Sequence, residues 1–125
     1  MEKSKKILVI DDEPELCELI KLILEDSGFT VEVLQDPNKA IRTIKEGEKP
    51  DLILLDVVMP EITGWEVCEK IKKDKEICNI PVMFLTVNAD SKYVEKGFAL
   101  GAKSYMCKPF QPVELLKRIM KILTA

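Results

Sequence analysis

The hydrophobic positions of this chain fall into five short runs separated by longer mixed segments. Three runs, Ile7–Ile10, Leu52–Leu55 and Val82–Leu85, are apolar throughout, which is typical of strands covered on both faces of a parallel sheet. The other two, Thr30–Leu34 and Ser104–Met106, mix polar and apolar residues. We therefore expect the first three strands inside a sheet and the last two at its edges.

The segments between these runs show helical patterns. Pro14–Ser27 carries the apolar residues Leu16, Leu19, Ile20 and Ile23 on one helical face, and Gly28 follows as a typical stop. Asp36 followed by Pro37 predicts the start of a second helix. Three further helices are expected around the apolar positions of Val67–Ile71, Tyr93–Leu100 and Val113–Leu123. Gly97 inside the fourth helix costs about 1 kcal/mol relative to alanine, so we expect this helix to be mobile.

Five repeats of strand and helix predict an α/β fold. Right-handed crossovers give a doubly wound parallel sheet with helices on both faces, a three-layer sandwich. The strand order 2-1-3-4-5 places the apolar runs in the centre. The length of 125 residues fits one domain, residues 1–125.

Composition narrows the class of protein. Acidic residues number 22 and basic residues 19, for a net charge of −3, which argues against direct nucleic-acid binding. No apolar run approaches the length of a membrane span or a signal peptide, so we expect a cytoplasmic protein without membrane contact. The chain has no histidine and no Cys-x-x-Cys pair. Its four cysteines are therefore expected to be free thiols.

Polar residues follow four of the five strands. Asp11 and Asp12 follow the first, Asp56 the third, Thr86 the fourth and Lys108 the fifth. Ligands of open α/β sheets bind outside the carboxyl ends of the strands, where the strand order reverses. That point lies between the first and third strands, so the three aspartates should converge there.

Three close carboxylates repel one another unless a cation lies among them. Oxygen ligands without histidine favour Mg²⁺. Lys108 and Thr86 add a positive charge and a hydroxyl suited to the oxygens of a phosphoryl group, and Asp56 could act as the nucleophile. Each of these residues alone is at least as often structural; their joint placement at the strand ends favours the chemical interpretation.

The chain resembles a response-regulator receiver domain of two-component signalling, the CheY-like family with a flavodoxin-like fold. The motifs that carry the resemblance are Ile7–Glu13, Asp51–Pro60 with Gly64, Phe84–Thr86 and Gly101–Phe110. The resemblance implies a phosphoprotein in which Asp56 is the phosphoacceptor. It also implies Mg²⁺, with Mn²⁺ as a substitute, bound by Asp11, Asp12, Asp56 and the backbone carbonyl of Val58.

The same resemblance implies a switch. Thr86 and Lys108 would hold the phosphoryl group, and Tyr105 would turn inward when Thr86 moves toward it. Lys108–Pro109 would be a cis peptide. A sensor histidine kinase or histidine phosphotransfer protein would supply the phosphoryl group. The face formed by the fourth helix, fifth strand and fifth helix would then change to control a partner or an output domain.

Two other functions stay open on the residues. The first is a Mg²⁺-dependent aspartate-nucleophile phosphatase of the haloacid dehalogenase type, although Asp56-Val57-Val58 lacks the second aspartate of that motif. The second is a receiver used only as an unphosphorylated docking module. The main hypothesis is not an enzyme beyond its own phosphorylation and dephosphorylation. The chain stops at Ala125, which fits either a regulator acting alone or a fragment of a longer one.

Overall fold

The computed structural model describes residues 4–59 and 61–124. Its sheet has five strands that all pair in parallel, in the order β2-β1-β3-β4-β5. The strands are β1 (Lys6–Ile10), β2 (Thr30–Leu34), β3 (Leu52–Leu55), β4 (Val82–Thr86) and β5 (Ser104–Cys107). The expected order is confirmed, and β1, β4 and β5 are each one residue longer than expected.

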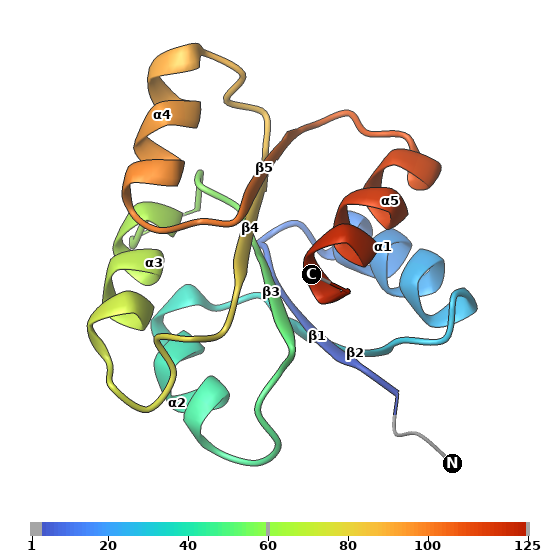
Figure 1. Ribbon diagram of the computed structural model, residues 1–125, viewed down its shortest axis with the longest axis horizontal. Coiled ribbons are helices and arrows are strands. Elements are labelled where there is room, and N and C mark those ends of the chain that lie inside the picture. The colour runs from blue at the N-terminus through green and yellow to red at the C-terminus, as the bar shows by residue number, and fades with distance from the viewer. Residues whose placement is uncertain (1–3, 60, 125) are drawn as a thin grey trace.

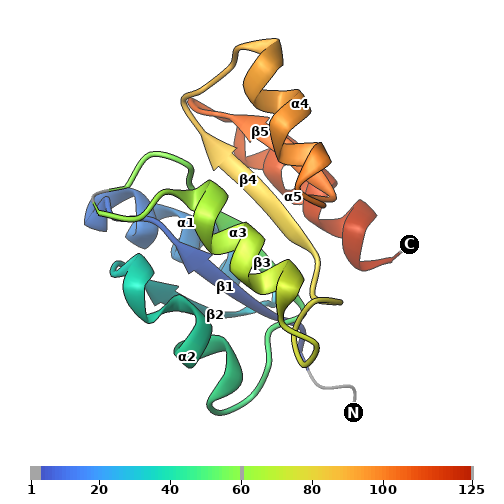
Figure 2. The same cartoon turned by 90° about the vertical axis from the view of Figure 1, so that its left-hand side faces the viewer.

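Helices cover both faces of the sheet, as expected for a doubly wound fold. Helices α1 and α5 lie on one face, and α2, α3 and α4 lie on the other (Figure 1 and, from the side, Figure 2). The helices are α1 (Pro14–Asp26), α2 (Ala40–Lys45), α3 (Gly64–Lys73), α4 (Ser91–Ala99) and α5 (Pro112–Leu123), with a short 3-10 helix, η1 (Pro37–Lys39), before α2. This arrangement is the flavodoxin-like three-layer sandwich.

Alternate strand residues supply two separate cores. Ile7 and Val9 pack with α1 and α5, whereas Leu8 and Ile10 pack with the helices of the opposite face. Successive side chains of a strand point to opposite faces, so an apolar run such as β1 contributes to both cores. This double burial explains why the central strands are continuously apolar.

Two details of the helices differ from expectation. The Asp36 side chain accepts a hydrogen bond from Asn38 N, as an N-cap should, but it caps the 3-10 helix η1 rather than α2. Ile20 is buried in α1 as expected, but Leu19, expected on the same face, is 49% exposed; Cys17 and Leu24 are buried with Ile20 instead. A helical pattern sets the apolar stripe only to within one position, and tertiary packing chooses its centre.

Helix α3 begins directly beside the end of β3. Thr63 and Glu66 form a capping box, each accepting a hydrogen bond from the other's backbone. Gly64 follows, donates to the Val57 carbonyl at 2.9 Å, and lies against the Asp56 backbone. A Cβ at this position would overlap the Asp56 carbonyl oxygen. The start of α3 therefore fixes the segment that carries Asp56.

No helix among the described residues is long and apolar enough to cross a lipid bilayer. Pro60, the last residue of the second motif, and both ends of the expected domain, Met1 and Ala125, lie outside the described residues.

Candidate functional site

Three aspartates meet at the carboxyl ends of two neighbouring strands. Asp11 follows β1 and Asp56 follows β3; the Asp56 amide donates to the Ile10 carbonyl at 3.0 Å, which holds the two strand ends together. One carboxylate oxygen from each of Asp11, Asp12 and Asp56 lies within 4.8 Å of the others. Asp11 and Asp56 are only 2% and 4% exposed, whereas Asp12 is half-buried. The expected convergence is therefore present.

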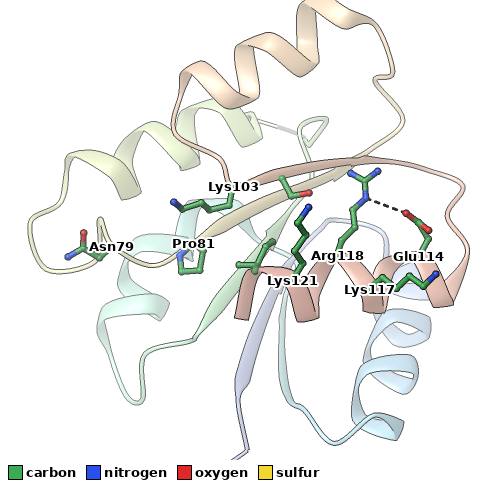
Figure 3. Close-up of a pocket in the computed structure, with 9 residues that line it drawn as sticks. Asn79, Pro81, Lys103, Glu114, Lys117, Arg118 and Lys121 are labelled. Atoms are coloured by element: carbon green, nitrogen blue, oxygen red, sulfur yellow. Dashed lines mark ion pairs between the residues drawn. The ribbon is translucent and has the colours of Figure 1, made fainter. Parts of the chain in front are cut away.

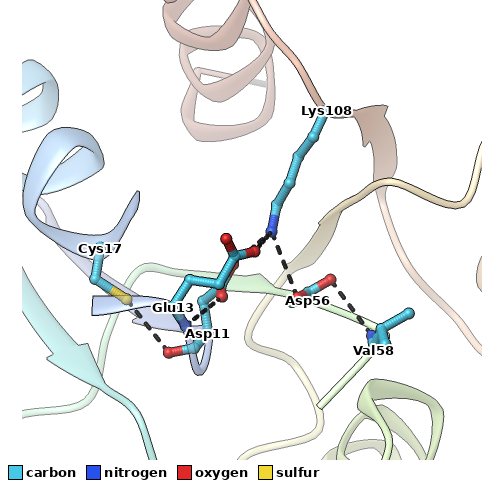
Figure 4. A network of polar contacts seen from close by, with 6 residues as sticks. All are labelled: Asp11, Glu13, Cys17, Asp56, Val58 and Lys108. Atoms are coloured by element: carbon cyan, nitrogen blue, oxygen red, sulfur yellow. Dashed lines mark hydrogen bonds and ion pairs between the residues drawn. The ribbon is translucent and has the colours of Figure 1, made fainter. Parts of the chain in front are cut away.

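Lys108 joins this cluster from the end of β5. Its ammonium group lies 2.8 Å from Asp11 Oδ2, 3.4 Å from Asp56 Oδ2 and 3.3 Å from Glu13 Oε1 (Figure 4). The peptide bond between Lys108 and Pro109 is cis. Glu13 had no assigned role in the sequence analysis, although it adjoins the two aspartates in the first motif.

The charges at the site do not balance. The ammonium group of Lys108 pairs with three carboxylates, those of Asp11, Glu13 and Asp56, and Asp12 adds a fourth carboxylate to the cluster. Burial raises the pKa of Asp11 in spite of its hydrogen bond to Lys108. Burial alone would lower the pKa of Lys108, but the hydrogen bond and charge of Asp11, with the charge of Asp56, raise it. Excess negative charge among hard oxygens suits a divalent cation.

Thr86 ends β4 beside this cluster. Its backbone carbonyl accepts a hydrogen bond from the Lys108 amide at 2.8 Å. Its side-chain hydroxyl is buried and has no hydrogen-bond partner among the described residues. Buried polar groups are normally paired, and an exception needs an explanation. A hydroxyl without a partner close to a lysine and buried carboxylates fits a site that receives an oxygen-rich ligand.

This unpaired hydroxyl gives a stability prediction. Thr86→Val should raise the free energy of unfolding by roughly 1 kcal/mol, because it removes a buried polar group that makes no hydrogen bond. Urea denaturation measures the change. Thr63→Val is the matched control: it removes the hydroxyl that accepts from Glu66 N at the start of α3, and should lower stability by about 1 kcal/mol. Equal losses in both variants would show that the Thr86 hydroxyl is paired.

Val58 lies in the loop after β3. Its amide donates to Asp56 Oδ1 at 3.4 Å (Figure 4), which ties the loop to the carboxylate, and the residue itself is 55% exposed. The backbone of this residue is thus held next to the acidic cluster, while its side chain points toward solvent.

Tyr105 lies inside the molecule. Its ring is 5% exposed, and its hydroxyl donates to the Asn88 carbonyl at 2.6 Å. Burial, with the nearby Cys107 and Asp56, raises the pKa of Tyr105 to about 12. The ring thus lies inward in this structure, and its inward turn upon phosphorylation stays a prediction.

The inward position of Tyr105 depends on Gly97. A Cβ on Gly97 would lie 2.9 Å from the Tyr105 ring and 3.2 Å from the Phe84 ring. The centroids of these two rings are 5.9 Å apart. Gly97 therefore has a packing role, because helix α4 can approach the rings only without a side chain there.

An apolar groove of about 430 Å³ lies beside Lys108. Leu19 and Val87 line it and are 49% and 62% exposed. Leu16 and Ile23 of α1, and Pro109, Phe110 and Pro112 from the segment after β5, complete the apolar lining. The acidic cluster thus has an apolar surface next to it.

Comparison with known proteins agrees with this geometry. The family model described as "Response regulator receiver domain" matches residues 7–120. The chain is similar to chemotaxis protein CheY4 of Vibrio cholerae, at 29% identity with a TM-score of 0.89 over 97% of this chain and 100% of the other. It is also similar to the non-phosphorylated HemR receiver domain of Leptospira biflexa, at 30% identity and a TM-score of 0.87 over 98% of this chain and 96% of the other.

Two curated relatives are longer proteins. The alkaline phosphatase synthesis transcriptional regulatory protein PhoP of Bacillus subtilis is 41% identical over 96% of this chain and 49% of its own length. The DNA-binding response regulator MtrA of Mycolicibacterium smegmatis is 36% identical over 92% and 49%. The chain thus spans about half the length of these relatives. The expectation of no direct nucleic-acid binding conflicts with the name of MtrA, a DNA-binding regulator. That expectation rested on the net charge of these 125 residues, which is not the charge of a longer regulator. The chain belongs to the response-regulator receiver domain family of two-component signalling.

Proposed function

We propose that this chain, taken as one receiver domain over residues 1–125, is a phosphorylation-activated switch that accepts a phosphoryl group on Asp56. The observation that carries the proposal is the position of the Asp56 carboxylate, which is 4% exposed, within 4.8 Å of two other carboxylates and 3.4 Å from Lys108. A buried carboxylate in this setting has a fixed orientation. It also has a cation at hand for the negative charge that phosphoryl transfer brings.

The transfer itself needs few groups. A carboxylate oxygen of Asp56 attacks phosphorus, the bond from phosphorus to the donor histidine nitrogen breaks, and its electron pair stays on that nitrogen, which takes up a proton. The product is an acyl phosphate on Asp56. These 125 residues include no histidine, so the donor histidine lies outside them, on a sensor kinase or a phosphotransfer protein.

Asp11, Asp12, Asp56 and the carbonyl of Val58 are the residues proposed to hold Mg²⁺. When bound, this ion neutralises charge on the phosphoryl oxygens and orients them. Lys108 would contribute a second positive charge from the end of β5. Its contacts with Asp11 and Glu13 keep the ammonium group beside Asp56 before any phosphoryl group arrives.

Thr86 and Tyr105 are proposed to transmit the change. The unpaired Thr86 hydroxyl can donate to a phosphoryl oxygen, which would draw the end of β4 toward Asp56. The Tyr105 hydroxyl holds the Asn88 carbonyl, two residues beyond Thr86. A shift of that segment would therefore act on Tyr105 in β5 and on Gly97 in α4, and change the face made by α4, β5 and α5.

The donor is proposed to approach over the apolar groove beside Lys108. Leu19, Val87 and Phe110 give this groove an apolar surface next to a carboxylate that a donor histidine must reach. An amphipathic helix that carries the histidine would bury these side chains. This placement leaves the α4-β5-α5 face free for a downstream partner.

The proposal is tested by labelling with acetyl phosphate in the presence of Mg²⁺. Wild-type protein should incorporate phosphate, Asp56→Asn should incorporate none because the amide is not a nucleophile, and EDTA should block the wild type. Asp26→Asn, which changes an exposed carboxylate at the end of α1, is the control and should label normally. Undiminished labelling of Asp56→Asn would contradict the proposal. Continuous turnover of an added phosphate ester would instead support a phosphatase.

A further inference from the structure

A second groove, of about 730 Å³, lies away from the acidic site. It runs between α5 and the beginnings of β4 and β5 (Figure 3). Pro81, just before β4, lines the groove with Lys103 from the segment before β5 and with Lys117, Arg118 and Lys121 from α5. Strand β5 is an edge strand of the sheet, so one side of this groove has no further strand beside it.

The groove is strongly basic. Lys103, Lys117 and Lys121 are exposed, and none of their ammonium groups forms an ion pair or a hydrogen bond within residues 4–59 and 61–124. Arg118 is partly buried; it lies 3.7 Å from Glu114, the one carboxylate in the lining, and donates to the Tyr105 carbonyl at 2.8 Å. Three unpaired lysines therefore gather on one side of a chain whose net charge is −3.

The charge pattern favours one kind of occupant. A second copy of this chain in a two-fold arrangement would bring the basic patches of both copies to one interface, where like charges are repulsive. A nucleic acid would meet an acidic chain outside the groove, whereas nucleic-acid binding normally needs a basic domain. A short acidic segment of another protein could form ion pairs with the three lysines and still stay away from the acidic residues on the rest of the chain.

We propose that this groove binds an acidic peptide segment of a partner protein. The partner is the downstream target in the proposed function, and to that extent the inference rests on it. The groove adjoins the proposed output face, because Arg118 contacts the backbone of Tyr105 directly. A change in Tyr105 can thus reach a groove residue through a single hydrogen bond.

The test uses the whole chain and a fluorescein-labelled peptide of repeated Glu-Glu-Leu, followed by fluorescence anisotropy. A matched peptide with glutamine in place of glutamate and an oligothymidine strand are the comparison probes. The variant Lys103→Gln, Lys117→Gln, Lys121→Gln should bind the acidic peptide about tenfold more weakly, the sum expected of three exposed ion pairs. The glutamine peptide should not bind.

The control variant is Lys39→Gln, Lys70→Gln, Lys75→Gln. It removes the same charge from exposed lysines outside the groove and should keep wild-type affinity. Equal affinity of the groove variant and the wild type, or equal loss in the control, would overturn the proposal; tighter binding of oligothymidine through the same lysines would assign the groove to nucleic acid instead. Labelling of Asp56 is measured separately, so failure of the groove and failure of the phosphoacceptor are distinguishable.

Discussion

Gly64→Ala should cost the domain roughly 1–3 kcal/mol of folding free energy and should also abolish labelling of Asp56. The new Cβ would overlap the Asp56 carbonyl oxygen and lie 2.8 Å from both the Asp56 carbonyl carbon and Val57 Cα. All of these are backbone atoms, so no side-chain rotation can relieve the contact. The loop must move, and the Asp56 carboxylate moves with it away from Lys108.

Urea denaturation and acetyl phosphate labelling measure the two effects of Gly64→Ala together. Gly47→Ala is the control, because a Cβ at position 47 would have no atom within 4 Å and so would not displace Asp56. It should lose about 1–2 kcal/mol, since the backbone φ of +74° is left-handed, but it should label normally. Normal labelling of Gly64→Ala would mean that Asp56 tolerates a shift of its own backbone.

Lys108→Met should slow labelling of Asp56 by about 10²–10³-fold, the usual effect of losing one group that stabilises charge in the transition state. The methionine keeps an unbranched side chain one atom shorter than that of lysine, but it has no charge to place beside a phosphoryl oxygen. Binding of Mg²⁺ should persist or tighten, because the ammonium group that contacts Asp11 and Asp56 no longer competes with the ion.

Labelling rates and calorimetric titration with MgCl₂ separate these two effects of Lys108→Met. Lys45→Met removes a lysine that is ion-paired with Asp74 at 2.9 Å, and should change neither. A labelling rate equal to that of the wild type would exclude Lys108 from the transfer. Loss of Mg²⁺ binding in a folded variant would mean that Lys108 organises the carboxylates rather than the phosphoryl group.

The sheet could be predicted because burial determines its sequence. The runs Ile7–Ile10 in β1, Leu52–Leu55 in β3 and Val82–Leu85 in β4 are apolar throughout because helices cover both of their faces. This pattern alone placed the three strands in the centre of the sheet. The convergence of Asp11 and Asp56 followed, because parallel strands end at one edge of the sheet. The ends of elements were less predictable, as the 3-10 helix before α2 shows.

Features that depend on packing between distant elements could not be predicted. The inward ring of Tyr105 requires Gly97 on α4 and Phe84 on β4 to leave space for it, and no local pattern records such a fit. The basic groove likewise combines Lys103 with two lysines of α5, each of which alone looks like an ordinary solvated residue. The contact of Glu13 with Lys108 was also not predicted, although Glu13 adjoins Asp12 in the first motif.

The central claim is that Asp56 carries the phosphoryl group, and mapping the modified residue tests it most directly. Wild-type protein is incubated with acetyl phosphate and Mg²⁺ and reduced with borohydride, which converts an aspartyl phosphate to homoserine, and its peptides are then sequenced by mass spectrometry. The account predicts homoserine at position 56 and at no other aspartate. Homoserine at Asp11 or Asp12, or incorporated phosphate with Asp56 unmodified, would contradict it.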